Sequence, residues 1–314
     1  HKPAEEFAAT DLFGMDTWSA ASGATPQFTS GFPVDMAFWR DKNNTSNGYT
    51  VDRLRSTYYL EMTSTAAEAS SSIYQFDYMT GYGSSTSAFS TIQSWMFRRA
   101  PGFFDVVAYT GNGSGTHNVS HNLGVKPELV ICKSRSTGGT GYNWPTITDT
   151  SVSSAATLFL NTNSSNNGGS SSGMFTDTTV NVGSTAGLAS LYGSNQVNAS
   201  SVTYIMYLFA SVAGISKVGS YTGTAANLDV NCGFTSGARF VLVKRTDSTG
   251  DWYLWDSERG IVAGNDPYLF LNSTAAQVTS TDYIDPLSSG FTITSSAPAA
   301  LNASGGTYIF LAIA

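Results

Sequence analysis

Charged residues are scarce in this sequence. Lys, Arg, Asp and Glu together make up 12% of its 314 residues, about half of their share in a typical globular domain. Ser, Thr, Gly and Asn occupy most polar positions instead. The formal net charge is −7 and no basic stripe is present, so binding to nucleic acid through its phosphates is not expected. A weakly charged, turn-rich sequence favours a β protein that works outside the cytoplasm.

Cysteine and long apolar runs are also lacking. Cys132 and Cys232 are the two cysteines, and no wider disulfide framework accompanies them. We expect Cys132 to be a buried thiol, and a disulfide is the less favoured alternative. The longest apolar run, Thr203–Ile215, is too short to cross a bilayer. No membrane insertion is therefore expected.

Histidine, the commonest catalytic and zinc-binding residue, occurs three times. His117 and His121 have the spacing of two metal ligands on one face of a helix. The residues between them favour a strand, and Asn122–Gly124 favours a turn. We therefore interpret both histidines as polar residues at a strand edge.

The acidic residues offer little for catalysis. The candidates for a carboxylate pair that cleaves glycosidic bonds are Asp247, Asp251, Asp256 and Glu258. However, Arg259 follows Asp256 by three residues, and Arg55 follows Asp52 in the same way. We expect two structural ion pairs, Asp52–Arg55 and Asp256–Arg259. No catalytic residue, metal or cofactor is predicted; calcium in a loop such as Asp282–Asp285 is a minor alternative.

The chain is rich in internal similarity. TIQSWMFRRAPGFFDVVAYTG (Thr91–Gly111) has the same order of residue types as VTYIMYLFASVAGISKVGSYTG (Val202–Gly223), and the end of the chain, TYIFLAIA (Thr307–Ala314), repeats the first half of that pattern. Each copy closes one unit, and the first two copies also open the next. The pattern predicts three tandem repeats, at residues 1–101, 102–213 and 214–314.

Each predicted unit contains one near-continuous apolar segment that ends in a basic residue. The three segments are Gly31–Lys42, Gly124–Arg135 and Ser236–Thr246, and their basic residues are Arg40, Lys133 and Lys244. A strand that is apolar at successive positions is buried on both faces. We expect these segments to be the central strands of their units.

The fold class that follows is all-β, with three small antiparallel β-sandwiches in tandem. Short strands with turn signals about every ten residues are typical of such sandwiches, and no long segment has a helical apolar period. A unit of about 100 residues buries only about 60–65% of its chain surface. We therefore expect the units to dock end to end, as a rod, and the chain to form a homo-oligomer.

Aromatic residues in loops are the candidates for carbohydrate binding. Tyr142 and Trp144 lie next to a Gly-rich turn, and Trp252 and Trp255 lie in a second aromatic segment. Aromatic faces bordered by polar groups are typical of ligand sites. For Trp252 and Trp255 the preferred alternative is packing in the core. For Tyr142 and Trp144 exposure is an equal alternative, because Pro145 disfavours a central strand.

As a set, several motifs resemble a repeat found in tail and tail-fibre proteins of bacteriophages, especially marine ones. The motifs are the Gly31–Lys42 strand, Asp-x-x-Arg-Gly at Asp256–Gly260, the Leu-x-Leu-Asn-Ser-Thr-Ala-Ala run at Leu269–Ala276, and the closing strand at Thr307–Ala314. The resemblance covers almost the whole chain and is weakest at His1–Phe28 and Trp144–Thr157. It implies a structural or receptor-binding virion component and no catalytic residues.

The functional prediction is a non-enzymatic tail-fibre or host-recognition protein on the surface of a virion. Its implied partners are sister chains in a trimer, other tail proteins and a host cell-surface glycan. One alternative is a tail adaptor or capsid decoration protein without a ligand. The other is an extracellular enzyme that acts on glycans.

Overall fold

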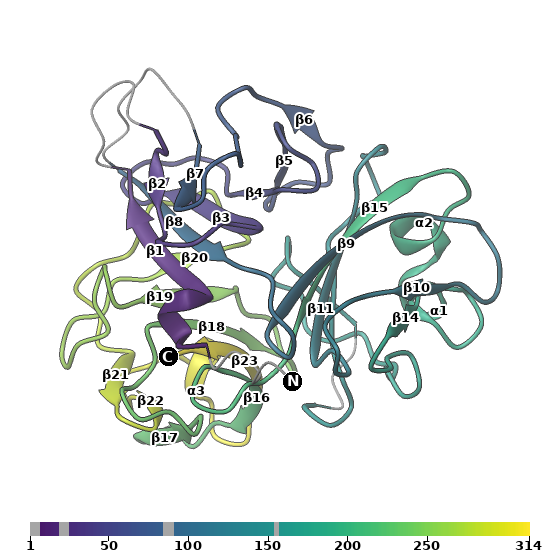
Figure 1. Ribbon diagram of the computed structural model, residues 1–314. Coiled ribbons are helices and arrows are strands. Elements are labelled where there is room, and N and C mark those ends of the chain that lie inside the picture. Colours follow the sequence, from purple (N-terminus) through teal and green to yellow (C-terminus); the bar gives the residue numbers. More distant parts are fainter. Residues whose placement is uncertain (1–6, 19–24, 84–90, 154–156) are drawn as a thin grey trace, which may run out of the picture.

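The computed structural model describes residues 7–18, 25–83, 91–153 and 157–314. Figure 1 shows three groups of strands around a common centre. We call them unit 1 (β1–β8), unit 2 (β9–β15) and unit 3 (β16–β23). Every sheet takes its strands from one unit, and all strand pairs are antiparallel, from β1–β8 of unit 1 to β16–β23 of unit 3. The predicted all-β, antiparallel fold is confirmed.

Unit 1 consists of a large sheet and a two-stranded sheet. The order in the large sheet is β1 (Phe13–Thr17), β8 (Ile92–Phe97), β3 (Met36–Asp41), β4 (Tyr49–Asp52), β5 (Tyr58–Glu61) and β6 (Ala69–Ser70). The small sheet pairs β2 (Phe28–Thr29) with β7 (Gly81–Tyr82). The first strand therefore pairs with the last, and the last pairs with the central strand.

Unit 2 has the same order in its large sheet. Its strands are β9 (Phe104–Thr110), β15 (Thr203–Phe209), β11 (Leu129–Ser134), β12 (Pro145–Thr148) and β13 (Leu158–Phe159), and the small sheet pairs β10 (Asn118–Ser120) with β14 (Thr179–Asn181). The central strand β11 is buried at all six positions.

Unit 3 repeats that order once more. Its large sheet contains β16 (Ser216–Thr222), β23 (Thr307–Ile313), β18 (Phe240–Arg245), β19 (Tyr253–Asp256) and β20 (Leu269–Phe270). Its small sheet contains β17 (Leu228–Asn231), β22 (Gly290–Ile293) and β21 (Ile284–Leu287). In the described residues helix is limited to short turns: η1 (Ala9–Asp11), α1 (Leu188–Tyr192), α2 (Ser194–Val197) and α3 (Ala299–Asn302).

One face of each large sheet packs against the small sheet of its own unit. In unit 1 this face carries Ala37 and Met96, which contact Phe28 and Tyr82 in one cluster. Units 2 and 3 have corresponding clusters of their own. Since side chains alternate across a strand, the neighbouring positions point to the opposite face of the sheet.

The opposite faces of the three large sheets pack against one another in a single shared core. Met36, Ile131 and Leu242, from the three central strands, belong to this one cluster. The ring of Phe97 lies 5.6 Å from that of Phe209 and 6.1 Å from that of Phe240, centre to centre. The units therefore surround a common centre, and the predicted end-to-end rod is wrong.

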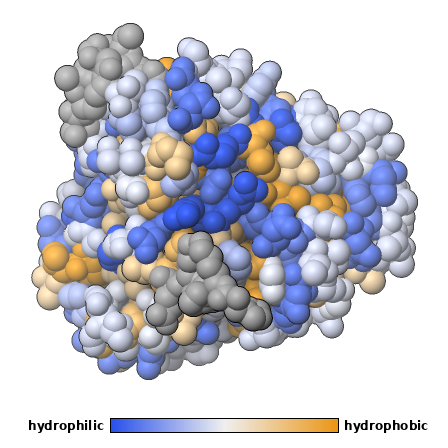
Figure 2. All heavy atoms as spheres, in the orientation of Figure 1, coloured by the Kyte–Doolittle hydropathy of each residue, from blue (hydrophilic) through white to orange (hydrophobic). Residues whose placement is uncertain are grey.

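The face seen in Figure 2 is largely hydrophilic or neutral, with smaller hydrophobic areas between. Large hydrophobic side chains that are exposed among the described residues are Leu54, Tyr58, Met79, Val125, Val262 and Val278. No helix in the described part of the chain is long and apolar enough to span a membrane. Both cysteines are buried and unbridged, which confirms Cys132 as a buried thiol.

Candidate functional site

Several buried polar groups lie where two units meet, and the interface of units 1 and 2 has an ion pair at its centre. Arg55 Nε lies 2.6 Å from Asp52 Oδ2, and neither side chain is exposed. Tyr207 of unit 2 donates its hydroxyl to Asp52 Oδ2 over 2.7 Å. Burial alone would lower the pKa of Arg55, but the adjacent Asp52 and Tyr207 raise it above its ordinary value. The predicted Asp52–Arg55 pair is thus present, and it also joins two units.

The interface of units 1 and 3 repeats this arrangement with other residues. Arg259 Nε lies 2.6 Å from Asp256 Oδ2. Trp95 of unit 1 donates its Nε1–H to the same carboxylate oxygen over 2.9 Å, and the guanidinium of Arg259 lies over the Trp95 ring at 5.6 Å. The similarity of Thr91–Gly111 to Val202–Gly223 aligns Trp95 with Tyr207, but it does not indicate that both donate to a carboxylate of a neighbouring unit.

Among the described residues, the interface of units 2 and 3 lacks such a pair. Strand register places Thr148 at the position that Asp52 has in unit 1 and Asp256 has in unit 3. The partners of these three residues occupy the same position of the central strand: Leu129 for Thr148, Met36 for Asp52 and Phe240 for Asp256. In the same way Leu311 stands where Trp95 and Tyr207 stand. The absence of the Asp-x-x-Arg motif from unit 2 is therefore matched by the absence of an aromatic donor from unit 3.

The tryptophans predicted to bind carbohydrate lie inside the protein. Trp144 and Trp252 are 0% and 2% exposed, and Trp255 is 0% exposed. Trp255 donates its Nε1–H to Asp266 Oδ2 within unit 3. Because a buried ring cannot stack on a sugar from solvent, these three candidates are corrected to interior residues. Tyr142 is half-buried and stays a prediction.

Trp144 and Trp252 each donate a hydrogen bond to the neighbouring unit. Trp144 Nε1 donates to the carbonyl oxygens of Glu61 and Ser64 in unit 1, both over 3.1 Å. Trp252 Nε1 donates to the carbonyl oxygen of Phe159 in unit 2 over 2.9 Å. Register shows that Glu61 and Phe159 occupy matching positions. One carbonyl at the end of the fifth strand thus accepts a bond from the next unit.

Unit 1 supplies this bond by a different residue. At the position of the two tryptophans it has Gly48, and the side chain of Arg40 fills the space: a Cβ on Gly48 would lie 2.5 Å from Arg40 Cδ. Arg40 donates to the carbonyl oxygens of Phe270 and Ser273 in unit 3, and Phe270 matches Glu61 and Phe159. The three units are therefore joined head to tail in a closed ring.

Arg40, Lys133 and Lys244 are fully buried cations, and none forms an ion pair with a carboxylate of a described residue. Lys133 Nζ donates to the carbonyl oxygens of Tyr142 and Thr65, and Lys244 Nζ donates to that of Arg245. Burial lowers the pKa of each lysine to about 8. Burial, together with the charge of Arg259, also lowers the pKa of Arg40 to about 10.

The histidines and the Asp-rich loops do not form a metal site in the described residues. His117 Nδ1 lies 2.7 Å from Asn198 Oδ1, and His121 Nε2 lies 3.1 Å from the carbonyl oxygen of Thr176. Asp247 is paired with Arg245. Over the described part of the chain, no group of three or more His, Cys, Asp or Glu is placed to hold a metal ion.

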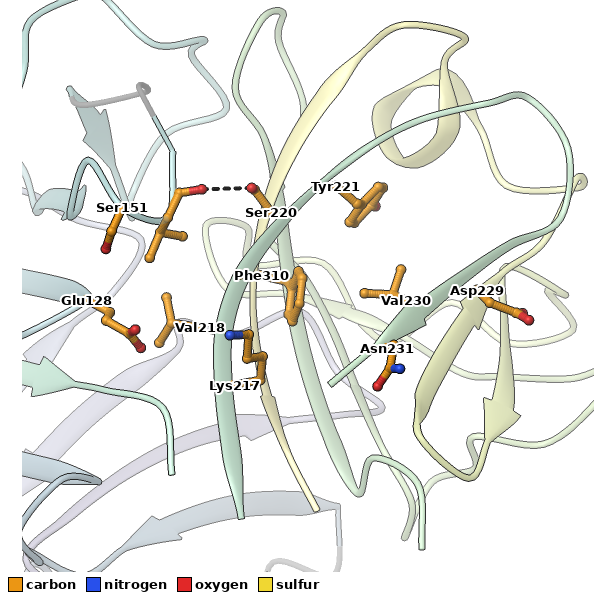
Figure 3. A pocket seen from close by; sticks show the side chains of 12 residues that line it. Glu128, Ser151, Lys217, Val218, Ser220, Tyr221, Asp229, Val230, Asn231 and Phe310 are labelled. Atoms are coloured by element: carbon orange, nitrogen blue, oxygen red, sulfur yellow. Dashed lines mark hydrogen bonds between the residues drawn. The ribbon is translucent and has the colours of Figure 1, made fainter. Parts of the chain in front are cut away.

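A cleft of about 380 Å³ lies at the interface that lacks an Asp–Arg pair (Figure 3). Unit 2 contributes the Glu128 carboxylate and residues Ser151 and Val152, and unit 3 contributes β16, part of β17 and the ring of Phe310. Ser220 Oγ donates to the carbonyl oxygen of Val152 across the cleft over 2.7 Å. Sequence reasoning missed this cleft, because its residues come from separate units and form no motif.

Residues 80–314 match the model of a family described as a domain of unknown function, DUF7483. The match covers about three quarters of the chain. The chain belongs to this family. The matched DUF7483 segment runs from β7 through units 2 and 3, so it contains the cleft, both buried lysines and the Asp256–Arg259 pair. No curated protein matches the sequence.

We propose that Arg40 and Gly48 of unit 1 are equivalent to the Lys and Trp residues of units 2 and 3, and exchanging them for Lys and Trp tests this equivalence. We expect Arg40→Lys and Gly48→Trp each to lower the free energy of unfolding by about 1–3 kcal/mol, because one leaves carbonyls without a donor and the other overpacks the site. The double variant has the pair found in units 2 and 3 and should regain most of the loss. A double-mutant cycle from urea unfolding measures the coupling. Losses that simply add would contradict the proposed equivalence.

The buried lysines provide a second test. Because their pKa values are lowered to about 8 from 10.5, the folded protein binds fewer protons than the unfolded chain between these values. Stability should therefore rise with pH from about 8 towards 10, by at most about 1.4 kcal/mol per pH unit for each lysine. Below pH 8 both states are protonated and this slope disappears.

The control is a double variant, Lys133→Met with Lys244→Met, measured by urea unfolding at several pH values in the same window. Its stability should rise less with pH than that of the unaltered protein. The measurements stay below about pH 10, where tyrosines of the unfolded chain begin to ionise. Equal slopes in the two proteins would show that these lysines are not responsible.

Proposed function

We propose that this protein is a non-enzymatic structural component of a bacteriophage virion, in a tail fibre or similar appendage that contacts host-cell glycans. The observation that carries the proposal is the use of its buried charged groups. Asp52 and Asp256 each form an ion pair with an arginine of their own unit and accept a hydrogen bond from an aromatic side chain of a neighbouring unit. These carboxylates strengthen the assembly of the chain and are inaccessible to a substrate.

We further propose that the three units are tandem copies of one β-sandwich module. Matching details support this: Tyr109 stacks on Tyr204 and Tyr221 stacks on Tyr308, with ring centres 5.1 and 4.8 Å apart. Both hydroxyls donate to a carbonyl oxygen in a short helix, those of Val197 and Leu301. Trp18 of unit 1 occupies the position that Tyr109 and Tyr221 have in units 2 and 3. Its backbone N–H donates to the carbonyl oxygen of Ile92, which is the counterpart of Tyr204 and Tyr308.

A rigid, protease-resistant projection is the function that suits such a ring. Proteases act on segments that open locally, and segments with many buried contacts open rarely. Each pair of units is bridged by main-chain bonds in addition to the shared core. Examples are Glu68 N to Arg135 O, Asn166 N to Thr246 O and Gln277 N to Lys42 O. These contacts disfavour a hinge between units.

The enzymatic alternative has weaker support. Asp251 accepts a hydrogen bond from Asn272, and Asp247 is paired with Arg245. Glu258, whose pKa is raised by burial, accepts a hydrogen bond from Gln93 of unit 1. These carboxylates thus have structural partners. The other alternative, a tail adaptor or capsid decoration protein without a ligand, is equally consistent with the fold.

Trimer formation stays a prediction. One reason to expect a trimer is the apolar surface that a small isolated sandwich leaves exposed. In this chain the shared core already covers that surface. A homotrimer would therefore need a further contact surface. Measuring the mass of the purified chain in solution distinguishes a single ring from three.

Gold-labelled antibodies against the purified protein, viewed by electron microscopy on the parent virion, test the proposed function. We expect label on the tail or its fibres. Label confined to the capsid would favour a decoration protein, and particles without any label would overturn the virion assignment. Hydrolysis of host polysaccharide by the purified protein, abolished by Glu258→Gln, would overturn the non-enzymatic assignment.

A further inference from the structure

We propose that the cleft between units 2 and 3 binds a neutral saccharide through Lys217 and Glu128. The inference rests on the proposed function, since it names the place at which a host glycan would be held. The cleft has a volume of about 380 Å³, at the lower end of the range of small-molecule sites. That volume suits about one or two sugar rings.

One position that lines the cleft differs between units 2 and 3. Register matches Lys217 of β16 with Asp105 of β9. In unit 2 the Asp105 carboxylate accepts a hydrogen bond from the backbone N–H of Asn122 over 2.7 Å, which ties the edge strand to the loop after β10. A lysine cannot accept such a bond. At this position unit 3 therefore has a cation that lines the cleft, in place of a carboxylate bonded to the backbone.

Two opposite charges face this space without pairing. Figure 3 shows the Lys217 side chain extending towards Glu128 across Val218. Lys217 has no ion pair within 4.0 Å among the described residues, although it lines the same cleft as Glu128 and Asp229. Glu128 Oε2 accepts bonds from the backbone N–H and hydroxyl of Ser211, which leaves Oε1 available in the described structure.

A hydroxyl group suits this arrangement. An ammonium only donates hydrogen bonds and a carboxylate only accepts them, whereas a hydroxyl does both. Neighbouring hydroxyls of a sugar can accept from Lys217 and donate to Glu128 at the same time. Because Lys217 balances Glu128, and Asp229 Oδ1 already accepts a hydrogen bond from the hydroxyl of Thr292, the ligand needs no charge of its own. Exposed Asn231, also at the cleft, offers both a donor and an acceptor.

The floor of the cleft is apolar and rigid. The ring of Phe310 lies across Gly219, its partner in the register, so closely that a Cβ on Gly219 would be 2.5 Å from the ring. Tyr221 is held by stacking on Tyr308 and by its hydrogen bond to the carbonyl oxygen of Leu301. A preformed site loses little entropy when it orders a ligand.

An extended peptide fits this place less well than a compact sugar. A peptide would add to the free edge of β16 through main-chain bonds. The backbone N–H of Val218 already donates to Ser211 Oγ over 3.0 Å. At Ser220 the carbonyl of Val152 approaches within hydrogen-bond distance of the side chain. The edge therefore lacks a free run of backbone groups at these two positions.

An array of neutral hexose and N-acetylhexosamine oligosaccharides, probed with the full chain, tests the proposal. For each sugar that binds, titration calorimetry compares the unaltered protein with Lys217→Met, Glu128→Gln and Ser151→Trp. Ser151 is exposed and lines the cleft, so a tryptophan there should fill the space. The matched control is Asp177→Asn, at an exposed position of unit 2 outside the residues that line the cleft.

We expect Lys217→Met and Glu128→Gln to weaken binding roughly tenfold to a hundredfold, as the loss of a hydrogen bond to a charged group does. Ser151→Trp should weaken binding because its ring occupies the cleft. The control should bind as the unaltered protein does. Circular dichroism and urea unfolding confirm that each variant is folded. If glycans bind and the folded cleft variants bind equally well, the cleft is not the site, but glycan recognition stands. If no neutral glycan binds, the cleft proposal is overturned together with glycan recognition, while virion labelling still decides the structural role.

Discussion

Apolar side chains on both faces of each large sheet impose the constraint on which this structure depends. The small sheet of a unit packs on only one of these faces. The remaining faces, which carry residues such as Met36, Ile131 and Leu242, are buried only where the three sheets meet. Exposing them would cost about 25 cal/mol for each Å² of apolar surface, so the units hold one another in place.

Hydrogen bonds at the interfaces then determine which side of each unit faces the next unit. Trp144, Trp252 and Arg40 each donate to a matching carbonyl of the adjacent unit, so one contact is made three times by two kinds of side chain. The Asp–Arg pairs strengthen two of the interfaces. The third interface has Thr148 and Leu311 at the corresponding positions, and the cleft lies at this interface. Differences between otherwise similar units therefore coincide with the cleft that we propose as a ligand site.

The strands, the antiparallel all-β class and the two Asp–Arg pairs could be predicted, because they depend on local spacing and on alternation within one segment. Alternation indicates that a residue is buried but not against which partner. Trp144 illustrates the limit: Pro145 after it indicated a loop, yet the indole donates to the carbonyls of Glu61 and Ser64, which lie 83 and 80 residues earlier. The shared core was missed for the same reason, since a strand buried on both faces is equally compatible with a rod.

Small-angle X-ray scattering of the purified chain tests the closed ring most directly. A compact chain of this length has a radius of gyration of about 20 Å, and we expect that value at low protein concentration. Three sandwiches of about 13 Å each, placed end to end, would give a value close to 30 Å. The larger value for a monomeric sample would contradict the shared core and the interfaces that depend on it.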